Sequence, residues 1–369
     1  MRKKMSFFTF KLLLLCALFF WSACSNDSAE NPTAPGGDPA DGLAVGTPAS
    51  QNIDEALLAS AYQQARQQNG LRSLLVARNG VLVAEEYFGG YNRNRLNHVR
   101  SVTKSVVATL IGIAIREGFL QNTNQTLSEF LQPYSENRDG TKGQIAIEHL
   151  LTMTSGFSWN ETNGNEYGSW ITSGDQIDYV IDKPLVAAPG QQFTYNSGTS
   201  HLLSAILTQA TRMSTKAFAE KYLFAPLGIT DVAWDQVSDG IYNGGAGLQL
   251  TARDMVKFGF LYLQNGVSGG EQIVPAEWIT RAWQQKQTLG FAYGPLKSVH
   301  YGYLWWMEKG GAHDAFFAWG YGGQFVFCVP DLNLVVTTTS QWQLSAADAS
   351  AQERANMDLI VNKVLPAVR

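Results

Sequence analysis

Two spacings of hydrophobic residues divide this chain into helical and extended segments. Apolar residues spaced as on one helix face predict helices, and runs of β-branched and aromatic residues predict strands. The predicted helices cover residues 52–68, 147–152, 176–181, 200–211, 215–223, 252–264, 275–284 and 351–364. The predicted strands are a hairpin over residues 74–84 that turns at Asn79-Gly80, and residues 315–319, 324–329 and 334–339. Strands at both ends around a helical block predict an α+β fold, in which one antiparallel sheet with N- and C-terminal flanking helices carries a large inserted helical subdomain.

The composition fits one large domain. Of the 369 residues, 45% are hydrophobic and 16% are charged, which is enough apolar material to bury a large core. We expect this domain to span residues 51–369. Its sheet would come from about residues 51–100 and 300–369, and its helical part from about residues 101–299.

One predicted helix combines an apolar surface with a single basic residue. From Val102 to Ile115 the chain is apolar on every side of a helical wheel, but the first turn contains Lys104. An unpaired lysine is almost never fully buried, so Lys104 must face a polar cleft or serve a chemical purpose. Ser101 lies three residues earlier on the same face, within reach of the amine. A serine hydroxyl needs a neighbouring base to act as a nucleophile, and a desolvated lysine with a lowered pKa is such a base. Because a chain of this length holds roughly one Ser-x-x-Lys by chance, this motif alone does not decide the function.

The N-terminus is typical of an export signal. Basic residues at positions 2–4 precede an apolar run, residues 12–21, which is too short to span a bilayer. The run ends in Ser22-Ala23-Cys24, which resembles the lipobox of bacterial lipoproteins, although Trp21 replaces the usual aliphatic residue. We therefore expect a lipoprotein signal peptide and a location in the bacterial cell envelope, at the outer membrane or in the periplasm.

Three further expectations follow from this signal. Residues 1–23 would be removed, Cys24 would be the lipid anchor, and simple secretion without a lipid is the alternative. Residues 25–50 are rich in Ser, Asn, Asp, Ala, Pro and Gly, which predicts a flexible linker without regular structure. Any contact with a membrane would then be made only through the lipid anchor.

Charge and cysteine content exclude several classes of function. Removal of the signal takes away four basic residues and no acidic one, so the formal charge moves from -4 to -8. An acidic protein is poorly suited to bind nucleic acid. Apart from Cys24, the mature chain would keep only Cys328, which predicts no internal disulfide and a buried strand position for Cys328. No Cys and His cluster has metal-ligand spacing, so we expect no metal or other cofactor.

A second motif, Tyr195-Asn196-Ser197, lies within residues 189–198. Together with Ser101-Val102-Thr103-Lys104 and three further segments, this motif resembles the β-lactamase-related family of serine hydrolases over about residues 70–345. The further segments are residues 147–156, 223–229 and 320–324. The chain is similar to class C β-lactamases and D-alanyl-D-alanine carboxypeptidases, and most similar to 6-aminohexanoate-dimer hydrolases and related esterases. The resemblance implies a β-lactamase/transpeptidase-like fold.

The resemblance also implies a catalytic group. Ser101 would be the acylated nucleophile, Lys104 its base, and Tyr195 a tyrosine that exchanges protons with the serine and the leaving group. Ser197 occupies the third position of the family's Tyr-x-Asn or Tyr-x-Ser motif and is a candidate substrate contact. Because a free tyrosine has a pKa near 10, Tyr195 would need Lys104 as a neighbouring cation to act as a base. We expect the Lys104 nitrogen and the Tyr195 oxygen within about 4 Å of the Ser101 oxygen.

The family's third element normally reads Lys-Thr-Gly or His-x-Gly, and here it is Gly320-Tyr321-Gly322. In penicillin-recognising relatives the basic residue helps to hold the substrate carboxylate. Its absence counts against β-lactams and D-Ala-D-Ala peptides and favours short neutral acyl esters, unless Arg253 or Lys297 replaces it. Tyr321 and Gly322 are candidate substrate contacts.

The resemblance implies a backbone oxyanion hole as well. The N–H groups of Ser101 and Gly323 would bind the developing oxyanion, and the glycines would let the strand approach the carbonyl closely. A glycine-punctuated stretch, residues 158–174, predicts a lid whose Trp159, Tyr167 and Trp170 contact the substrate. An ordinary surface loop is the alternative.

Other motifs carry less weight. Residues 266–270 match Gly-x-Ser-x-Gly but lack a strand-turn-helix context, so we interpret them as a surface turn. We interpret His149 as a hydrogen-bonded structural residue. Trp305, Trp306 and Trp319 could line an apolar pocket or fill the core.

We therefore predict a serine hydrolase that cleaves an ester or amide of a small molecule through an acyl-enzyme. A β-lactamase or D-Ala-D-Ala carboxypeptidase is the alternative within the class. A catalytically silent binding protein on the same fold is the alternative outside it. The sequence predicts no particular oligomeric state.

Overall fold

The structure is a computed structural model that describes residues 42–132, 140–161 and 164–369. Within these residues, nine strands form one sheet in the order β1-β3-β2-β14-β13-β12-β11-β10-β9. All neighbours are antiparallel except β1, which runs parallel to β3. The strands are β1 (Ala44–Val45), β2 (Leu71–Arg78), β3 (Val81–Tyr87), β9 (Gln287–Tyr293), β10 (Leu296–Tyr301), β11 (Trp306–Glu308), β12 (Ala315–Gly320), β13 (Gln324–Val329) and β14 (Leu334–Ser340).

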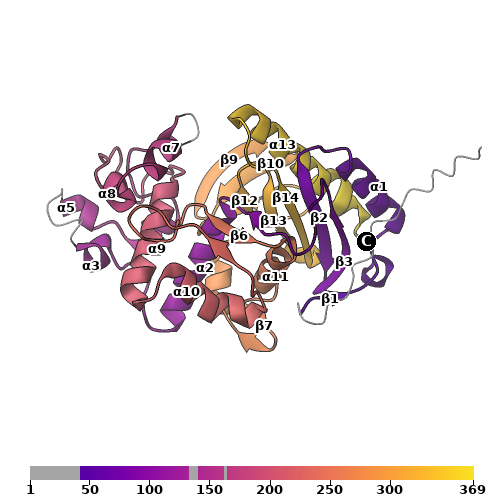
Figure 1. Cartoon of the computed structure of the whole chain (residues 1–369), viewed down its shortest axis with the longest axis horizontal. Helices are drawn as coiled ribbons and strands as arrows, with labels where there is room; N and C mark the ends of the chain where they lie inside the picture. The colour runs from indigo at the N-terminus through magenta and orange to yellow at the C-terminus, as the bar shows by residue number, and fades with distance from the viewer. Residues whose placement is uncertain (1–41, 133–139, 162–163) are drawn as a thin grey trace, which may run out of the picture.

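Helices form the second part of the molecule and also cover the sheet. Figure 1 shows α3, α5, α7, α8, α9 and α10 on the left, the large sheet on the right, and α2 between them. The helices are α1 (Glu55–Ala65), α2 (Val102–Arg116), α3 (Leu127–Phe130), α5 (Gly140–Gly143), α6 (Ile147–Leu151), α7 (Glu166–Ile171), α8 (Gln176–Ile181), α9 (Ser197–Thr211), α10 (Thr215–Ala219), α11 (Ala252–Leu263), α12 (Ala276–Ala282) and α13 (Ala346–Asp358). Short 3-10 or π-helical segments are η1 (Ala49–Gln51), η2 (Glu220–Phe224), η3 (Ala225–Leu227), η4 (Pro330–Leu332), η5 (Leu359–Val364) and η6 (Leu365–Ala367).

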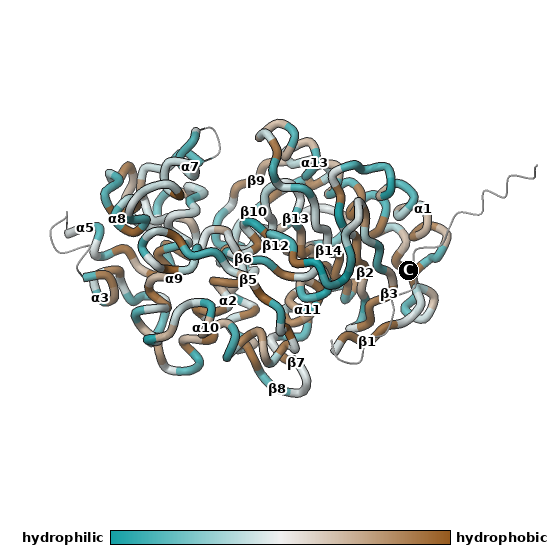
Figure 2. Tube along the Cα trace, viewed as in Figure 1, coloured by the Kyte–Doolittle hydropathy of each residue, from teal (hydrophilic) through white to brown (hydrophobic). Residues whose placement is uncertain are grey.

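The sheet separates two hydrophobic cores, because successive side chains of a strand point to opposite faces. On β2, Leu75 and Ala77 belong to the core that contains α2, α9 and α11. Leu74 and Val76 belong to the core beneath α1, α13 and η5. Hydrophobic residues gather along the central strands of the sheet (Figure 2). At about 1.5 to 3 kcal/mol for each fully buried large aliphatic side chain, these two cores provide most of the stabilisation of the fold.

Most predicted elements are confirmed. The hairpin turn at Asn79-Gly80 has φ of 55° and 80°, as a two-residue primed turn requires. Cys328 is buried in β13. Residues 266–270 lie in a small hairpin of β7 (Val267–Ser268) and β8 (Glu271–Gln272), which agrees with a surface turn.

Some boundaries were predicted wrongly. Strand β9 and the start of β10 lie within residues 101–299, which we predicted to be helical; β9 is largely exposed, so it lacks the apolar alternation of a buried strand. Helix α13 begins at Ala346, before the predicted residue 351. Helix α9 begins at Ser197 rather than at residue 200, because the Asn196 side chain accepts a hydrogen bond from the Thr199 N–H and caps the helix there.

The predicted linker ends earlier than expected. Ala44 and Val45 pair with Val81 and Leu82 of β3, and η1 follows, so residues 42–50 are part of the fold rather than a tether. The predicted signal peptide, Cys24 and residues 25–41 lie outside the described residues. Within the described ranges, no helix is both long enough and apolar enough to cross a membrane.

Candidate active site

Ser101 lies at the N-cap position of α2, directly after a residue with an uncommon backbone conformation. Arg100 has a φ of 53°, in the left-handed region that non-glycine residues rarely adopt. An N-cap serine usually accepts a hydrogen bond from the first helical turn, but the Ser101 hydroxyl makes no such bond. The Ser101 N–H likewise has no hydrogen-bond partner among the described residues. Both groups are therefore available to a reacting molecule.

Lys104 lies in the first turn of α2 with its side chain inside the protein. Its exposed fraction is 1%. The Lys104 Nζ atom lies 2.9 Å from Ser101 Oγ, 2.8 Å from Ser197 Oγ and 2.7 Å from the Gly245 carbonyl oxygen. All three partners are uncharged, so the amine is hydrogen-bonded without a direct ion pair.

Glu161 gives this network a direction. Its carboxylate accepts the Ser197 hydroxyl hydrogen at 2.6 Å and the Ser197 N–H at 2.8 Å. The Ser197 oxygen must therefore accept from Lys104, and the Gly245 carbonyl can only accept. A neutral Lys104 amine has two hydrogens and one lone pair. With both hydrogens donated to these acceptors, the lone pair is left for the Ser101 hydroxyl.

The surroundings of Lys104 favour its neutral form. Burial lowers the pKa of Lys104 to about 8, the negative charge of Glu161 raises it, and the positive charge of Arg100 lowers it. An amine with this pKa is partly unprotonated at weakly alkaline pH. It can then act as a general base.

Tyr195 lies just before α9 and is also close to Lys104. Its ring centroid lies 4.9 Å from the Lys104 Nζ atom, and its phenol is near enough to Ser101 for that hydroxyl to affect its pKa. Burial, and then the negative charge of Glu161, raise the pKa of Tyr195 well above 10, while the Ser101 hydroxyl lowers it. Tyr195 is therefore protonated at neutral pH and suited to donate a proton, and Lys104 is the residue suited to accept one.

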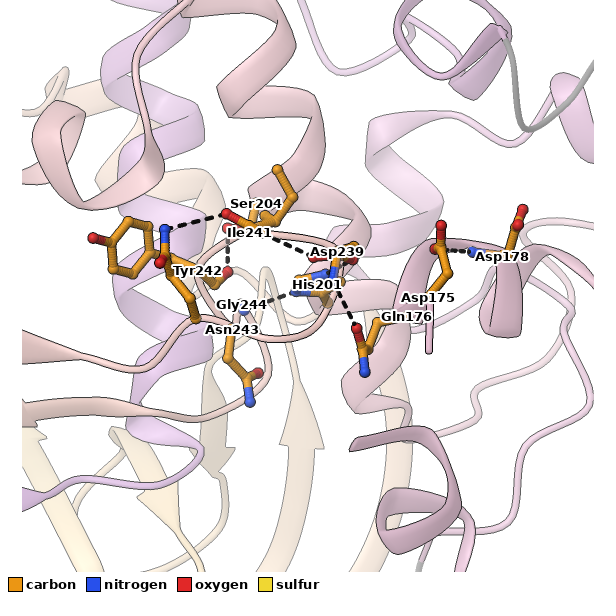
Figure 3. Close-up of polar contacts among 12 residues, drawn as sticks. Asp175, Gln176, Asp178, His201, Ser204, Asp239, Ile241, Tyr242, Asn243 and Gly244 are labelled. Carbon is orange, nitrogen blue, oxygen red and sulfur yellow. Dashed lines mark hydrogen bonds and ion pairs between the residues drawn. The ribbon is translucent and has the colours of Figure 1, made fainter. Parts of the chain in front are cut away.

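A buried hydrogen-bonded pair, His201 and Asp239, supports the loop that carries Gly245 (Figure 3). The His201 Nε2 atom lies 2.9 Å from Asp239 Oδ2, with both side chains at most 2% exposed. The Gly244 N–H donates to His201 Nδ1 at 3.4 Å, so the ring hydrogen is on Nε2 and is donated to Asp239. Asp239 also accepts from the Ile241 N–H at 2.8 Å. Helix α9 thus holds this loop and, through it, the Gly245 carbonyl.

The turn between β12 and β13 differs from the predicted oxyanion hole. The Gly323 N–H donates to the Gly320 carbonyl at 3.0 Å, so the predicted second donor is already used within the turn. The Gly322 N–H donates to Glu353 at 2.8 Å, which removes it as a substrate contact. The remaining N–H of this turn, that of Tyr321, has no partner within the described part of the chain.

The absence of a side chain at position 320 has a steric cause. A Cβ atom at Gly320 would lie 2.2 Å from the Val99 carbonyl oxygen, far inside any allowed contact. The Val99 N–H is bonded to the Leu248 carbonyl at 3.0 Å, next to the pairing of β4 (Asn97–His98) with β6 (Leu248–Leu250). A short sheet of these strands with β5 (Ala233–Trp234) therefore fixes the segment before Ser101 against β12.

Neither predicted substitute for the missing basic residue lies at this position. Arg253 donates to both carboxylate oxygens of Glu85, at 2.8 and 2.5 Å, inside the core. Lys297 is exposed near the end of β10 that pairs with Glu308, and this end is opposite to that of Gly320. The cation adjacent to the contact is Arg100, which sequence reasoning did not consider.

The aromatic residues predicted to contact the substrate have different positions. Trp170 is fully buried in the helical part, so its predicted substrate contact is wrong. Trp159 is 8% exposed and donates its indole N–H to Glu161, which makes it a support for that carboxylate. Tyr167 lines a cavity next to Arg100. The lid over residues 158–174 stays a prediction, and residues 162–163 lie outside the described ranges.

The three tryptophans that could either line a pocket or fill the core differ in burial. Trp305 is fully buried, whereas Trp306 and Trp319 are half-buried. The Trp306 ring lies 5.6 Å from that of Tyr195, so it packs against the candidate site. His149 accepts a hydrogen bond from the Ala146 N–H at the start of α6, which confirms a structural role.

Sequence reasoning missed Glu161, His201, Asp239 and Gly245. Their spacing from Ser101 carries no periodic signal, because the contacts are made by loops that come together only in the folded chain. Within the described residues, no group of three or more His, Cys, Asp and Glu side chains could hold a metal ion.

Comparison with known proteins agrees with this geometry. The beta-lactamase family model matches residues 58–359. The chain belongs to the β-lactamase family, a family of serine hydrolases. This β-lactamase-family protein is 26% identical over 292 residues to 6-aminohexanoate-dimer hydrolase of Paenarthrobacter ureafaciens, covering 73% of this chain and 72% of that enzyme. It is 24% identical over 187 residues to Protein flp of Staphylococcus aureus, covering 48% of this chain and 37% of that protein.

Solved structures of low identity share the fold. A penicillin-binding protein homologue from Pyrococcus abyssi, described as octameric, has a TM-score of 0.67 at 18% identity, covering 84% of this chain and 77% of that one. EstCE1, described as a hydrolase with promiscuous acyltransferase activity, has a TM-score of 0.65 at 17% identity, covering 82% of this chain and 98% of that one. The β-lactamase/transpeptidase-like fold of this family member is thereby confirmed.

Proposed function

We propose that this protein hydrolyses an ester or amide bond of a small molecule through an acyl-enzyme on Ser101. The observation that carries the proposal is the direction of the Lys104 network. Because Ser197 and Gly245 take both hydrogens of a neutral Lys104 amine, its lone pair faces the Ser101 hydroxyl. That arrangement is what activation of a serine nucleophile requires.

In the proposed acylation step, Lys104 removes the Ser101 hydroxyl proton and Ser101 Oγ attacks the substrate carbonyl carbon. The carbonyl oxygen becomes an oxyanion, which the Ser101 N–H binds. We assign the second donor to the N–H of Tyr321 in place of Gly323, because the Gly323 N–H is used within its turn. Tyr195 then protonates the leaving alcohol or amine and recovers a proton from the Lys104 ammonium.

Deacylation repeats the sequence with water. Water gives a proton to the same base and attacks the Ser101 ester, and the carboxylic acid leaves while Ser101 regains its hydrogen. The Glu161–Ser197 contact is a positioning device in both halves, because it keeps the Ser197 oxygen as an acceptor for Lys104. Neither half requires a cofactor.

The proposal is tested by a fluorophosphonate probe and an acyl ester. The probe should modify Ser101, seen as one labelled peptide by mass spectrometry, and p-nitrophenyl butyrate should be hydrolysed with an initial burst. Ser101→Ala should lower the hydrolysis rate by about 10³-fold or more with an unchanged melting temperature. Absence of both labelling and hydrolysis would support a silent binding protein. A higher kcat/KM for nitrocefin than for the ester would support a β-lactamase.

We also propose that the protein is exported and attached to the cell envelope through Cys24. Support comes from the charged and apolar pattern before Ser22-Ala23-Cys24. Metabolic labelling with palmitate should mark the wild-type protein and not Cys24→Ala. Export of an unlabelled wild-type protein would instead support simple secretion.

A further inference from the structure

A cavity of about 570 Å³ adjoins the candidate site on the side of Arg100. Its walls come from the segment before Ser101, from α7, from the β5–β6 loop and from the chain after β14. Its lining includes His98, Arg100, Tyr167, Asp235, Asn243 and Trp342. A volume of this size is typical of small-molecule sites.

Arg100 is the unusual member of this cavity. It makes no ion pair within the described residues, and its Nε atom is buried without a hydrogen-bond partner. Burying a polar group of a charged side chain without a partner is costly, and most buried charges in proteins are paired. Arg100 also has the uncommon φ of 53°, so the backbone is held in the conformation that places this side chain next to Ser101.

Two aromatic rings hold the Arg100 guanidinium. Its Cζ atom lies 4.6 Å from the ring centroid of Trp342 and 5.6 Å from that of Tyr167. Tyr167 and Asn243 line the same cavity as Arg100. Stacking on aromatic rings engages the faces of the guanidinium plane. The N–H groups at its edge remain directed within that plane, where a carboxylate binds in a bidentate manner.

The other charged groups of the cavity do not neutralise this position. The His98 Nε2 atom lies 3.1 Å from Asp235 Oδ2, and the pKa of His98 is lowered, first by burial and then by the positive charge of Arg100, so its ring is neutral at neutral pH. The Asp235 side chain is 52% exposed, and solvent screens its charge. The less screened charge of the cavity is therefore the partly buried cation.

The chain segments that line the cavity also carry groups of the candidate active site. Arg100 is the neighbour of Ser101, and Asn243 and Gly247 flank the Gly245 carbonyl that accepts from Lys104. A molecule with one end on Arg100 can therefore place a second group at Ser101. This adjacency gives a size limit, because both ends must fit one cavity and the site beside it.

We propose that the Arg100 cavity is a subsite for a carboxylate, so that the substrate is an ester or amide with a carboxylate several bonds from the reacting carbonyl. The inference rests on the proposed hydrolase function and narrows its substrate class. It replaces our expectation of neutral acyl esters, which depended on there being no cation beside Gly320. Arg100 comes directly after Val99, whose carbonyl lies against Gly320. The cation is therefore supplied by the segment before Ser101 and not by position 320.

The test compares mono-p-nitrophenyl esters of dicarboxylic acids of increasing length with their methyl esters and with ω-amino acyl esters. At the best length, the carboxylate ester should have a kcat/KM about ten- to a hundredfold above that of its neutral methyl ester. In Arg100→Gln this ratio should fall to about one, and Arg100→Lys should retain part of it. The matched control is Arg95→Gln, because Arg95 also lies over a tyrosine ring but is exposed and outside the cavity. That variant should keep the full ratio.

A binding experiment separates this proposal from the hydrolase proposal. Ser101→Ala protein should bind the free dicarboxylate of the best length in calorimetry, and adding Arg100→Gln should weaken that binding about tenfold or more. If the protein hydrolyses no ester but binds the dicarboxylate in a way that depends on Arg100, only the proposed hydrolase function is overturned. A preference for the ammonium or methyl ester, or dicarboxylate binding that ignores Arg100, would overturn the subsite. Equal melting temperatures of the variants exclude unfolding as the cause.

Discussion

Arg253 is buried where α11 packs on the sheet and Lys104 at the start of α2, and the hydrogen-bond partners of these two basic side chains differ in charge. In α11, Arg253 donates to both oxygens of Glu85, so two opposite charges meet directly. At the start of α2, Lys104 meets only uncharged oxygens, and the nearest carboxylate, that of Glu161, is reached through Ser197. The first arrangement keeps its cation charged in every state of the protein. The second allows its cation to lose a proton.

This difference teaches how to separate structural from reactive buried charges in this fold. A bidentate arginine pair exchanges solvation for a strong local contact, and removing one partner leaves an unpaired charge in the core. A lysine with a carboxylate one hydrogen bond removed is held in position while burial lowers its pKa. The following substitutions test that distinction, beginning with the largest expected effect.

Lys104→Met should remove the base and leave the fold. We expect kcat to fall by about 10³-fold, within the range known for loss of a general base. The melting temperature should stay or rise, because a desolvated amine is replaced by an apolar side chain of similar length. Measured kcat and thermal unfolding together check this. A strongly destabilised Lys104→Met would mean that this lysine is structural, like Arg253.

Arg253→Met should lower stability and leave kcat nearly unchanged, which is the opposite of Lys104→Met. Loss of Arg253 leaves Glu85 with only Arg93 and the Tyr87 hydroxyl as partners, so we expect a loss of about 3 kcal/mol in the free energy of unfolding, the low end for a broken buried pair. The kcat of the folded fraction should stay within about threefold of wild type, because α11 contributes no group to the Lys104 network. Chemical denaturation and active-site titration provide the two numbers. The double variant with Glu85→Gln should recover part of the stability.

Asp239→Asn tests whether one buried pair, His201 and Asp239, contributes both to stability and to catalysis. It retains an acceptor for His201 and removes the charge, so the free energy of unfolding should fall by about 1 to 3 kcal/mol. Because the pair supports the loop of Gly245, kcat should also fall, by about tenfold, with little change in KM. Steady-state kinetics and denaturation check both values. Unchanged kcat would show that this loop keeps its position without the pair.

Glu161→Gln should have the smallest and most specific effect. The neutral Lys104 amine is the active form, so the rate rises with pH through the Lys104 pKa of about 8. Since the negative charge of Glu161 raises this pKa, its removal should move the rising limb of the kcat/KM profile to lower pH. Glu166→Gln, at the start of α7 and paired with Lys183, is the matched control and should leave the limb in place. A limb that moves to higher pH would contradict the role of Glu161.

The sequence predicted the parts of the site that depend on local spacing. Ser101 and Lys104 are three residues apart on one helix, so their contact follows from helix geometry alone. Tyr195 required the family resemblance, because no local pattern connects it to α2. Glu161 could not be found, since its contact joins a loop to the start of α9, and the packing of the helical part decides how close they come.

Strands were predictable from the sequence where one or both of their faces are buried. Strands β12, β13 and β14 are buried apolar runs, and the sequence located all three. Strands β9 and β10 were missed, because β9 is exposed over most of its length and its residues show no buried alternation. Neither Arg253 nor Lys297 replaces the missing basic residue, because a sequence shows which residues are basic but not where they lie: Arg253 is paired in the core, and Lys297 is at the far end of its strand.

The contact between Gly320 and the Val99 carbonyl also constrains how this scaffold can evolve. A basic side chain at position 320, as in the penicillin-recognising relatives, cannot be gained by a single substitution, because the backbone before the nucleophile occupies its space. The same backbone is held by β6 and leads into Arg100 and Ser101. Positions 99, 100 and 320 therefore form one structural unit, and a rearrangement that made room for a side chain at position 320 would also move Arg100 and Ser101.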